Sequence, residues 1–493
     1  MKKMLIAALL LCLLSPCAQA ITMTGLETDT IERTWEGHAF FDRMEKLTGV
    51  EVQAYGEKDR SAYAAMLAGM ENGVMTSDVL FKAGLSREQE YALMQSGAIV
   101  DLAPYIDEHM PNLSALLAEH PQWKAEISLE DGRIASLPLL NMRERQVCVW
   151  INAQWLEKLG LQMPQTMDEL TEALAKMRTG DPNGNGRKDE VAADLLGVYE
   201  LRWLLPYFGI VSDDYSLARD ENGALYFAPE APQYRTFIEQ MKQWYDRGLL
   251  RKDAFTTMHS TAALNTTDED APAKSALLLS MTPYTHVPMD AVSQYQALLM
   301  PAPDGRMRWR DLLGEVWTGC FAVTSSCADI PAALRWADAL YAAEGALLAY
   351  AGVENQDYTV SADGSWAFVD NMDYDVDTIR ANSIIYTGEA TPGLYPGAFI
   401  HRVNSPLDRH VFAESEKVRE VSERVVPAHA LGRAEQARAV ELMNQLGAVV
   451  DSGIARFVTG ETELTDATYS AWLQELAEAG SAELVQLFAA AQQ

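Results

Sequence analysis

Basic residues are scarce in this chain. Its 493 residues include 39 Lys and Arg against 70 Asp and Glu, which gives a formal net charge of −31. A field this negative repels the phosphate backbone of nucleic acids and argues against nucleic acid as a partner. It is compatible with a soluble protein outside the cytoplasm and with the binding of cations. The apolar stretches are also too short to span a bilayer.

Cysteine is rare as well. Of five cysteines, two fall within the first twenty residues, which leaves Cys148, Cys320 and Cys327. An odd number excludes a fully paired disulfide framework. The residues between Cys320 and Cys327 have the pattern of a strand, and an extended strand of that length holds its ends too far apart for a disulfide. We therefore expect buried, unpaired cysteines that pack as small hydrophobic side chains.

The motifs of common enzymes are missing. The sequence contains no Gly-x-Ser-x-Gly elbow, no Walker loop, no dinucleotide-binding fingerprint and no His-Glu-x-x-His pair. Its eight histidines are scattered without the spacing of metal ligands. Carboxylates are so numerous that spacing alone selects no glycosidase-like pair.

The N-terminus has the pattern of a targeting segment. Residues 1–20 combine two lysines, a short apolar run from Leu5 to Leu14 and an Ala-x-Ala site that ends at Ala20. The residues before Cys17 resemble a bacterial lipobox, but Pro16 fits that motif poorly. Because Ile21 already begins a predicted strand, no flexible linker would follow a lipidated Cys17. The sequence therefore predicts a cleaved signal peptide and a secreted or extracytoplasmic protein, rather than a lipid anchor at Cys17.

Helical and strand patterns alternate along the chain. A helix over residues 61–72 precedes a strand over 78–81, and a second helix follows over 86–95. This spacing is typical of βαβ units and predicts an α/β fold with a mostly parallel sheet. The length of the chain favours two lobes or more. Helices over 433–457 and 466–490 complete the predicted fold.

One stretch carries a clear chemical signature, the ten residues 181–190. Side-chain oxygens recur at every second position, and glycines at 184 and 186 allow the tight turns that direct them inward. Ca²⁺ takes about 6–8 oxygen ligands, and an EF-hand loop supplies them at alternate positions. The predicted calcium ligands are Asp181, Asn183, Asn185, the backbone carbonyl of Arg187, Asp189 and Glu190.

The loop departs from the EF-hand at its end. The EF-hand places a bidentate Glu at position 12, and Ala192 occupies that position here. Glu190 would have to replace it, so the loop is predicted to be a structural calcium site rather than a helix–loop–helix sensor. The alternative is a metal-free surface turn rich in Asx residues.

The segments around this loop resemble a known family. They read Trp150-Ile-Asn-Ala-Gln-Trp-Leu-Glu-Lys-Leu-Gly160 and Met163-Pro-Gln-Thr-Met-Asp-Glu-Leu170. Together with the loop they are similar to the extracellular solute-binding proteins (family 1) of carbohydrate ABC importers. The similarity is to the calcium-loop branch, which includes alginate-oligosaccharide-binding proteins and LplA-type lipoproteins. Further landmarks follow in family order, so the resemblance covers essentially the whole mature chain.

The resemblance implies a two-lobed periplasmic-binding-protein fold of type II, with a hinge between the lobes. It implies lobe 1 over residues 21–147 and 320–405, and lobe 2 over 148–319 and 406–493. The implied function is not enzymatic: a monomeric protein captures a sugar or oligosaccharide by lobe closure and delivers it to the permease of an ABC importer. The calcium loop would then lie in lobe 2 and stabilise the end of the helix that precedes it.

Ligand-binding residues are expected on loops that face the cleft. Aromatic rings can stack on the C–H face of a sugar, and polar side chains can bind its hydroxyls. Each aromatic could equally be a core residue, and each cation could instead pair with one of the acids. The candidates are Trp35, Lys82, Arg145, Glu200, Trp203, Tyr284 and Trp317.

Two other interpretations remain. A secreted, calcium-stabilised carbohydrate-active enzyme would share the signal peptide, the loop and the aromatics, but it would need a catalytic motif that the sequence lacks. A dockerin-like module would need duplicated calcium loops, and the sequence has one.

Overall fold

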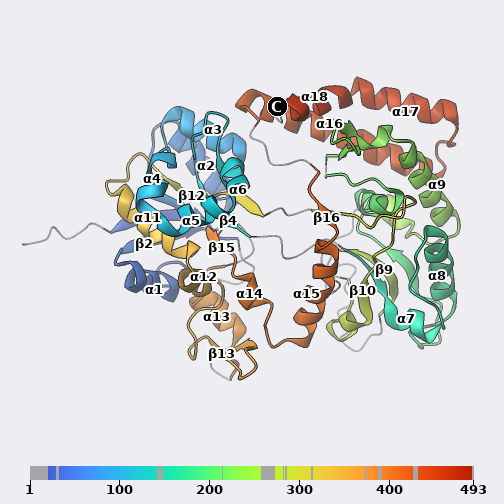
Figure 1. The fold of residues 1–493 in the computed structure, drawn as a ribbon, viewed down its shortest axis with the longest axis horizontal. Coiled ribbons are helices and arrows are strands. Elements are labelled where there is room, and N and C mark those ends of the chain that lie inside the picture. The colour runs from blue at the N-terminus through green and yellow to red at the C-terminus, as the bar shows by residue number, and fades with distance from the viewer. Residues whose placement is uncertain are drawn as a thin grey trace, which may run out of the picture.

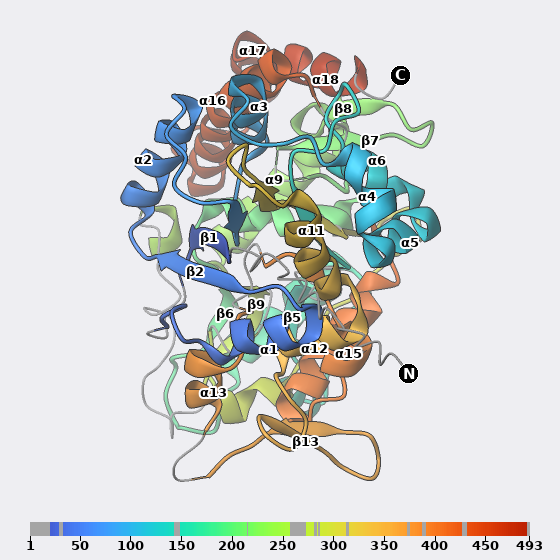
Figure 2. The same ribbon diagram turned by 90° about the vertical axis from the view of Figure 1, so that its left-hand side faces the viewer.

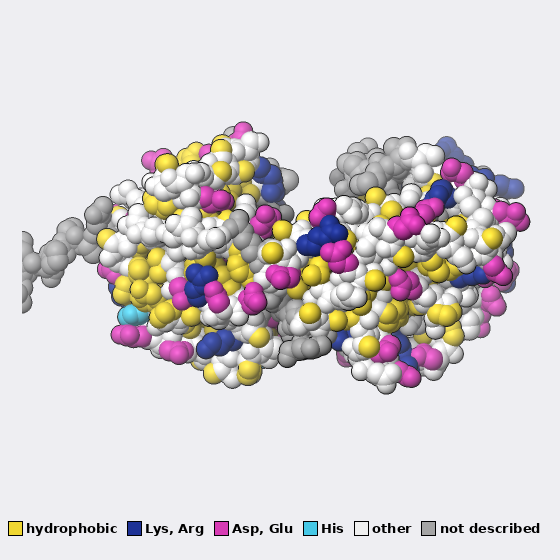
Figure 3. All heavy atoms as spheres, turned by 90° about the horizontal axis from the view of Figure 1, so that it is seen from above, with side chains coloured by type: hydrophobic (Ala, Val, Ile, Leu, Met, Phe, Trp, Pro, Cys, Tyr) yellow, Lys and Arg dark blue, Asp and Glu magenta, His cyan; other side chains and the backbone are white. Residues whose placement is uncertain are grey.

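A computed structural model describes residues 20–28, 33–141, 148–213, 215–256, 273–280, 283, 286–311, 315–371, 375–386, 391–425 and 431–490. The described chain forms two bodies side by side (Figure 1). Seen from above, the two bodies join at a narrower waist, and acidic side chains are scattered over both (Figure 3). Each body has its own sheet and its own main hydrophobic cluster. We call them the first and the second lobe.

The first lobe is built on a six-stranded sheet. Its strand order is β15-β4-β12-β3-β1-β2. The strands are β1 (Ile21–Leu26), β2 (Val52–Glu57), β3 (Val79–Phe81), β4 (Leu137–Leu140), β12 (Val316–Val323) and β15 (Gly393–Leu394). β1 pairs in parallel with both β2 and β3, whereas β12 runs antiparallel to β3 and β4.

Helices cover this sheet on both faces (Figure 2). They are α1 (Ala39–Thr48), α2 (Arg60–Glu71), α3 (Arg87–Ser96), α4 (Ala103–His109), α5 (Pro111–Glu119), α6 (Pro121–Ile127), α11 (Ile330–Asp338) and α12 (Ala343–Tyr350). The single-turn helix η6 (Ala339–Tyr341) joins the last two. The core between them is aromatic, because Phe40, Phe41, Phe81 and Trp336 pack ring against ring.

The second lobe is built on a four-stranded sheet in the order β10-β5-β9-β6. The strands are β5 (Cys148–Asn152), β6 (Val191–Asp194), β9 (Ser275–Ser280) and β10 (Tyr295–Ala297). Its helical elements are α7 (Ala153–Lys158), α8 (Met167–Thr179), η1 (Val198–Phe208), α9 (Pro232–Asp246), η3 (Asp253–Phe255), η5 (Met289–Gln294), α15 (Pro406–Arg419), α16 (Arg433–Thr459), α17 (Asp466–Glu478) and α18 (Ser481–Ala490). In Figure 1 the last three lie along the top of the molecule.

Short elements complete the fold. They are the pairs β7 (Leu217–Arg219) with β8 (Leu225–Phe227), β11 (Trp309–Arg310) with β16 (Ser422–Glu423) and β13 (Tyr358–Val360) with β14 (Trp366–Phe368), and the helices η2 (Ala228–Glu230), α13 (Val376–Asn382) and α14 (Gly397–Ile400). Among the described residues, no helix combines the length and the apolar character that crossing a bilayer requires.

The α/β fold in two lobes is confirmed, but the expectation of a mostly parallel sheet is only partly right. In the second lobe β5 runs antiparallel to both β9 and β10, and only β6 with β9 is parallel. Both sheets therefore contain a strand that runs against its neighbours, which a local pattern of alternating helices and strands does not reveal.

The lobe boundaries drawn from the sequence stay a prediction. The resemblance places the hinge crossings at the strand of Trp150–Asn152 and at the strand near Trp317–Thr324, which are β5 and β12, and the residues just before each strand, 142–147 and 312–314, lie outside the described residues. The expected boundary between residues 319 and 320 falls inside β12, and every described pair of that strand belongs to the six-stranded sheet.

The sequence Thr166-Met-Asp-Glu169 predicts a capped helix start at α8, and the structure shows the cap. Thr166 Oγ1 caps the helix by accepting the N–H of Glu169 at 3.2 Å. The carboxylate of Glu169 closes the cap one residue earlier than in a standard capping box, because it accepts the N–H of Gln165 at 2.8 Å. The three cysteines of the described chain are buried and free, as the sequence predicts.

Candidate functional site

A pocket of about 350 Å³ opens at one edge of the six-stranded sheet. β1 and β3 are parallel and both end there, and the carboxyl ends of parallel strands are the usual place for a ligand in an α/β fold. Its lining is mixed in polarity, with an indole, two cationic side chains and two hydroxyls. The lining residues are Leu26, Thr28, Arg60, Lys82, Gly84, Leu85, Ser86 and Trp317.

Trp317 is exposed in this pocket, and β12 is irregular beside it. The pairing of β12 with β4 shifts register between Trp317 and Phe321. Gly319, inside the shift, has φ of +78°, and a Cβ at that position would lie 2.1 Å from the carbonyl oxygen of Leu85. Only glycine allows this close approach. Trp317 is 38% exposed, whereas most tryptophans of the described chain are buried.

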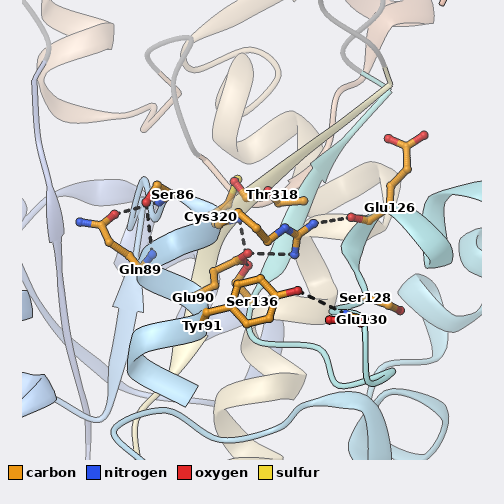
Figure 4. A network of polar contacts seen from close by, with 12 residues as sticks. Ser86, Gln89, Glu90, Tyr91, Glu126, Ser128, Glu130, Ser136, Thr318 and Cys320 are labelled. Carbon is orange, nitrogen blue, oxygen red and sulfur yellow. Dashed lines mark hydrogen bonds and ion pairs between the residues drawn. The ribbon is translucent and has the colours of Figure 1, made fainter. Parts of the chain in front are cut away.

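A buried polar network holds this part of β12 in place (Figure 4). The N–H of Gly319 donates to Ser136 Oγ at 2.9 Å, and the Ser136 hydroxyl in turn donates to a carboxylate oxygen of Glu90. Arg87 Nη1 lies 2.9 Å from the other oxygen of Glu90. Burial raises the pKa of the Glu90 carboxyl, although Arg87 and the Ser136 hydroxyl act in the opposite direction.

The same network reaches the contact between the lobes. Arg87 Nη2 donates to the carbonyl of Glu126 at 2.5 Å. The Glu126 carboxylate accepts from Arg424, just after β16, at 2.7 Å. Nearby, the hydroxyl of Tyr91 donates to the carbonyl of Leu431 at 2.8 Å. The part of β12 that carries Trp317 is thus connected by polar contacts to chain segments that pack with the second lobe.

A second buried cluster lies behind the pocket. One oxygen of Glu27 accepts from Trp35 Nε1 at 2.8 Å, from Lys82 Nζ at 3.0 Å and from Arg33 Nη1 at 3.3 Å. Burial by itself would raise the pKa of the Glu27 carboxyl, but Lys82, the Trp35 N–H and Arg33 outweigh it and lower that pKa to about 2. Lys82, with φ of +52°, is held in the left-handed region.

The predicted calcium loop connects α8 to β6 and is held by its own side chains. Asn183 Oδ1 accepts the N–H of Asn185 at 3.1 Å, and Asn185 Oδ1 accepts the N–H of Arg187 at 2.8 Å. Asp181 Oδ2 accepts the N–H of Gly186 at 3.1 Å, and Asn185 Nδ2 donates to Asp189 at 3.0 Å. Lys158 of α7 donates to the carbonyl of Pro182 and fixes the loop to its neighbour.

Three carboxylate oxygens of the loop are not satisfied by these contacts. Asp181 Oδ1 and both oxygens of Glu190 are buried without a hydrogen-bond partner. Burial, followed by the charges of Asp181 and Asp189, raises the pKa of Glu190. Buried unpaired carboxylates are costly, and a hard cation is the partner that removes the cost. Within the described chain no three acidic, His or Cys side chains converge enough to form a metal cluster alone, so a cation held here would also need amide or carbonyl oxygens.

The other candidate ligand residues lie elsewhere. Trp35 is only 2% exposed and packs on Phe41 and Phe81. It is therefore a core residue, and the expectation that its ring binds a sugar is corrected. Lys82 lines the pocket, but its ammonium is paired with Glu27, the alternative that the sequence left open. Arg145 and Tyr284 lie outside the described residues and stay predictions.

Glu200 and Trp203 belong to η1 in the second lobe. The Glu200 carboxylate is buried and accepts the N–H of Leu196 at 2.6 Å. Burial raises the pKa of Glu200 to about 7. Trp203 is half-buried, with the guanidinium of Arg310 6.0 Å from its ring. Neither residue lines the pocket at Trp317.

Sequence reasoning missed three polar residues of the pocket, Thr28, Arg60 and Ser86. Thr28 and Ser86 each come a few residues after a strand that ends at this edge, so the position of the strand ends was the available signal. Ser86 also opens α3 as a capping box with Gln89, and this role explains its presence without a ligand.

No protein-family model matches the sequence. Over 228 residues, 43% of this chain, the sequence is 32% identical to the fructooligosaccharide ABC transporter substrate-binding protein FusA of Streptococcus pneumoniae serotype 4, and the match covers 41% of that protein. Over 234 residues, 44% of this chain, it is 27% identical to lipoprotein LipO of Bacillus subtilis, with 42% of that protein covered. The chain thus matches about two fifths of the length of these curated relatives.

Solved structures show the same fold over nearly the whole chain. An extracellular solute-binding protein from Bifidobacterium longum subsp. infantis matches with a TM-score of 0.80 at 20% identity, over 95% of this chain and 97% of that one. FusA of S. pneumoniae in complex with kestose matches with a TM-score of 0.73 at 19% identity, over 95% and 98%.

These likenesses define the class of the chain: it has the two-lobed fold of the solute-binding proteins. Its relative FusA is named a substrate-binding protein of an ABC transporter, and the resemblance drawn from the sequence is confirmed.

Proposed function

We propose that this chain is an extracytoplasmic substrate-binding protein that captures an oligosaccharide and delivers it to an ABC importer. The observation that carries the proposal is the pocket at the carboxyl ends of β1 and β3, with the exposed indole of Trp317 beside hydroxyl and cationic groups. The relatives support it, since FusA is named for fructooligosaccharides and its structure holds kestose.

The chemistry of the pocket suits a sugar. An indole face can pack on the C–H face of a sugar ring, and the hydroxyls of Thr28 and Ser86 can exchange hydrogen bonds with those of the ligand. The Ser86 hydroxyl accepts a backbone N–H in its cap and still has its proton to donate. Arg60 can donate to sugar oxygens. Lys82 is neutralised by Glu27, so the pocket does not require an anionic sugar.

Capture would follow a shift of population between open and closed lobes. A ligand favours the closed state only by the contacts that it gains there from both lobes. Glu200 and Trp203 of η1 remain candidates for the contacts from the second lobe, as do Arg145 and Tyr284. This role requires no chemical step, and we propose a protein that binds and does not turn over its ligand, acting as a monomer with the permease as partner.

We also propose that the loop of residues 181–190 binds one Ca²⁺. The buried, unpaired oxygens of Asp181 and Glu190 are the observation from this chain. Two solved neighbours point the same way by name, an EF-hand mutant of FusA and alginate-binding protein AlgQ2 without calcium ion. Asp181, Asn183, Asn185, Asp189, Glu190 and the carbonyl of Arg187 would hold the ion. Bound there, it would neutralise the carboxylates and fix the end of α8 to β6.

For localisation we propose cleavage of a signal peptide after Ala20. Residues 1–19 lie outside the described residues, but β1 begins at Ile21, directly after the proposed site. A lipid on Cys17 would leave almost no linker between membrane and fold, so we favour a free protein over an anchored one.

The test is a thermal-shift and calorimetry panel with kestose, fructo-nystose, alginate oligosaccharides and a chitin oligosaccharide. A ligand present at about 100 times its Kd should stabilise the folded protein by about 2.7 kcal/mol. Trp317→Ala should weaken binding about tenfold or more. Tyr215→Ala is the matched control, because Tyr215 is an exposed aromatic of the second lobe that does not line the pocket. A wild-type protein whose melting temperature no sugar changes would refute the proposal.

A further inference from the structure

A second pocket, of about 370 Å³, lies where the first lobe meets α15. Six of its eleven lining side chains are aromatic, and its only charged side chains are Arg380 and Asp408. Of the ligand-binding residues predicted from the sequence, none that the structure describes lines it. An aromatic wall with one donor group and one acceptor group is unusual for a gap between packed elements and typical of a binding site.

The aromatic wall is ordered before any ligand arrives. Tyr350 and Tyr386 stack with ring centroids 3.8 Å apart, and Tyr395 packs edge-on against Tyr350 at 4.9 Å. Trp366 Nε1 donates to the carbonyl of Phe399 at 2.9 Å, which fixes the orientation of that indole. Aromatic pairs of this kind have few rotamers to lose when a ligand binds.

The walls come from both lobes. Tyr386 and Tyr395 are tied to the first lobe, because their N–H groups donate to the carbonyls of Ala349 and Leu140 at 3.0 Å. Asp408 and Phe412 lie on α15, which is tied to the second lobe. His410 Nε2 lies 2.6 Å from the carbonyl of Tyr295, and Glu414 accepts the N–H of Ala297 at 3.1 Å, both at β10. A ligand in this pocket therefore touches both lobes at once.

The polar groups indicate an uncharged, hydroxyl-rich ligand. Among the described residues, the Asp408 carboxylate has no hydrogen-bond or ion-pair partner, although its side chain is half-buried. It can accept from sugar hydroxyls, and the guanidinium of Arg380 can donate to them. A uronic acid would place its own carboxylate near that of Asp408, which is unfavourable.

The second pocket is connected to the pocket at Trp317 through the buried cluster of Glu27, Arg33 and Lys82. Lys82 lines the Trp317 pocket, and its ammonium lies 3.4 Å from the carbonyl of Ile385. The neighbours of Ile385, Ile384 and Tyr386, line the second pocket. Arg33 strengthens the connection by donating to the carbonyl of Arg380 at 2.6 Å. One short segment thus forms a wall of the second pocket and contacts the cluster behind the first.

We infer that the pocket of Tyr386, Trp366, Phe368, Arg380 and Asp408 is a second sugar subsite, which takes a neutral sugar ring of an oligosaccharide and favours longer ligands. The inference rests on the proposed function. Because its walls belong to both lobes, occupation of this subsite would also stabilise one relative orientation of the lobes.

The test is calorimetric titration of the full chain with sucrose, kestose and fructo-nystose. Asp408→Asn and Phe368→Ala should each weaken binding of nystose about tenfold or more, since they remove a charged acceptor and part of the aromatic wall. The loss should be smaller for sucrose, which is shorter than nystose and offers fewer sugar rings to a second subsite. Arg409→Gln is the control, because Arg409 neighbours Asp408 on α15 but is exposed and does not line the pocket.

The outcomes separate the two proposals. If the wild type binds nystose and both variants bind it equally well, the second subsite is refuted and the proposed function stands. If the wild type binds none of these sugars nor any of the wider panel, both fail. Melting temperatures of the variants without sugar show whether they fold, and Asp408→Asn, which is nearly isosteric, keeps the test valid if Phe368→Ala does not.

Discussion

Replacing Ser136 by alanine tests how the fold presents Trp317. The Ser136 hydroxyl accepts the buried N–H of Gly319 at 2.9 Å and donates to the buried Glu90 carboxyl, so one atom satisfies two buried groups. A buried donor left without its acceptor costs about 1–3 kcal/mol. The substitution should therefore destabilise the first lobe by about 2–3 kcal/mol.

The loss of stability of Ser136→Ala can be measured as a fall in the melting temperature. For a folding unit of the size of one lobe, each kcal/mol corresponds to about 2–4 °C, so Ser136→Ala should lower the melting transition by about 5–10 °C. Sugar binding should also weaken, because the irregularity of β12 at Gly319 positions Trp317. The control is Ser128→Ala, which loses one solvent-accessible hydrogen bond to the carbonyl of Lys124 and should cost less than about 0.5 kcal/mol.

The stabilising role of Ser136 is refuted if Ser136→Ala melts within about one degree of the wild type, or if Ser128→Ala loses as much stability. Either result would mean that the network in Figure 4 does not hold β12. A loss of stability with unchanged sugar affinity would separate the two claims, since the network would then stabilise the lobe without positioning Trp317.

Two further predictions concern buried carboxylates of the second lobe. Glu190→Gln should raise the melting temperature in EDTA, because it removes a buried charge beside Asp181 and Asp189. The same substitution should reduce the stabilisation that added Ca²⁺ gives. An unchanged calcium response would contradict the assignment of Glu190 as a ligand. Burial raises the pKa of Glu200 from 4.5 to about 7. The protonated carboxyl therefore stabilises the folded state fully below about pH 4.5, and this stabilisation, about 3 kcal/mol, is lost as the pH rises through 7. Glu200→Gln should flatten this part of the pH profile in urea unfolding, and identical profiles would disprove the burial argument.

The turn of residues 181–190 and α8 could be predicted because their signals are local. The capping residue Thr166, the apolar face of the helix and the alternating oxygens of the loop all lie within a few turns of one another along the chain. The hydrogen bonds within the loop span six residues or fewer, so the sequence contains these partners in order, whereas the bond from Lys158 to Pro182 spans 24 residues. The identity of the family followed from the same continuous stretch.

The ligand pocket could be predicted only in part. Trp317 and Lys82 were candidates because each lies at or beside a predicted strand, but Trp35 satisfied the same criterion and is a core residue. A tryptophan's exposure depends on which distant segments cover it. Phe81 and Gly56 pack against the ring of Trp35 and bury it, whereas Trp317 lies beside the irregularity in β12 and is exposed.

The sequence by itself determined the composition, the absence of disulfides among the described cysteines, the α/β class, the oxygen-rich loop of residues 181–190 and the kind of protein to which the chain is related. The tertiary structure decided which side chains meet. Gly319 and Ser136 are 183 residues apart, Ser136 and Glu90 are 46 apart, and the second pocket joins residues from Tyr350 to Phe412 across two lobes. Contacts over such separations leave no periodic pattern in the chain, because they are fixed by the packing of whole elements and not by the preferences of neighbouring residues.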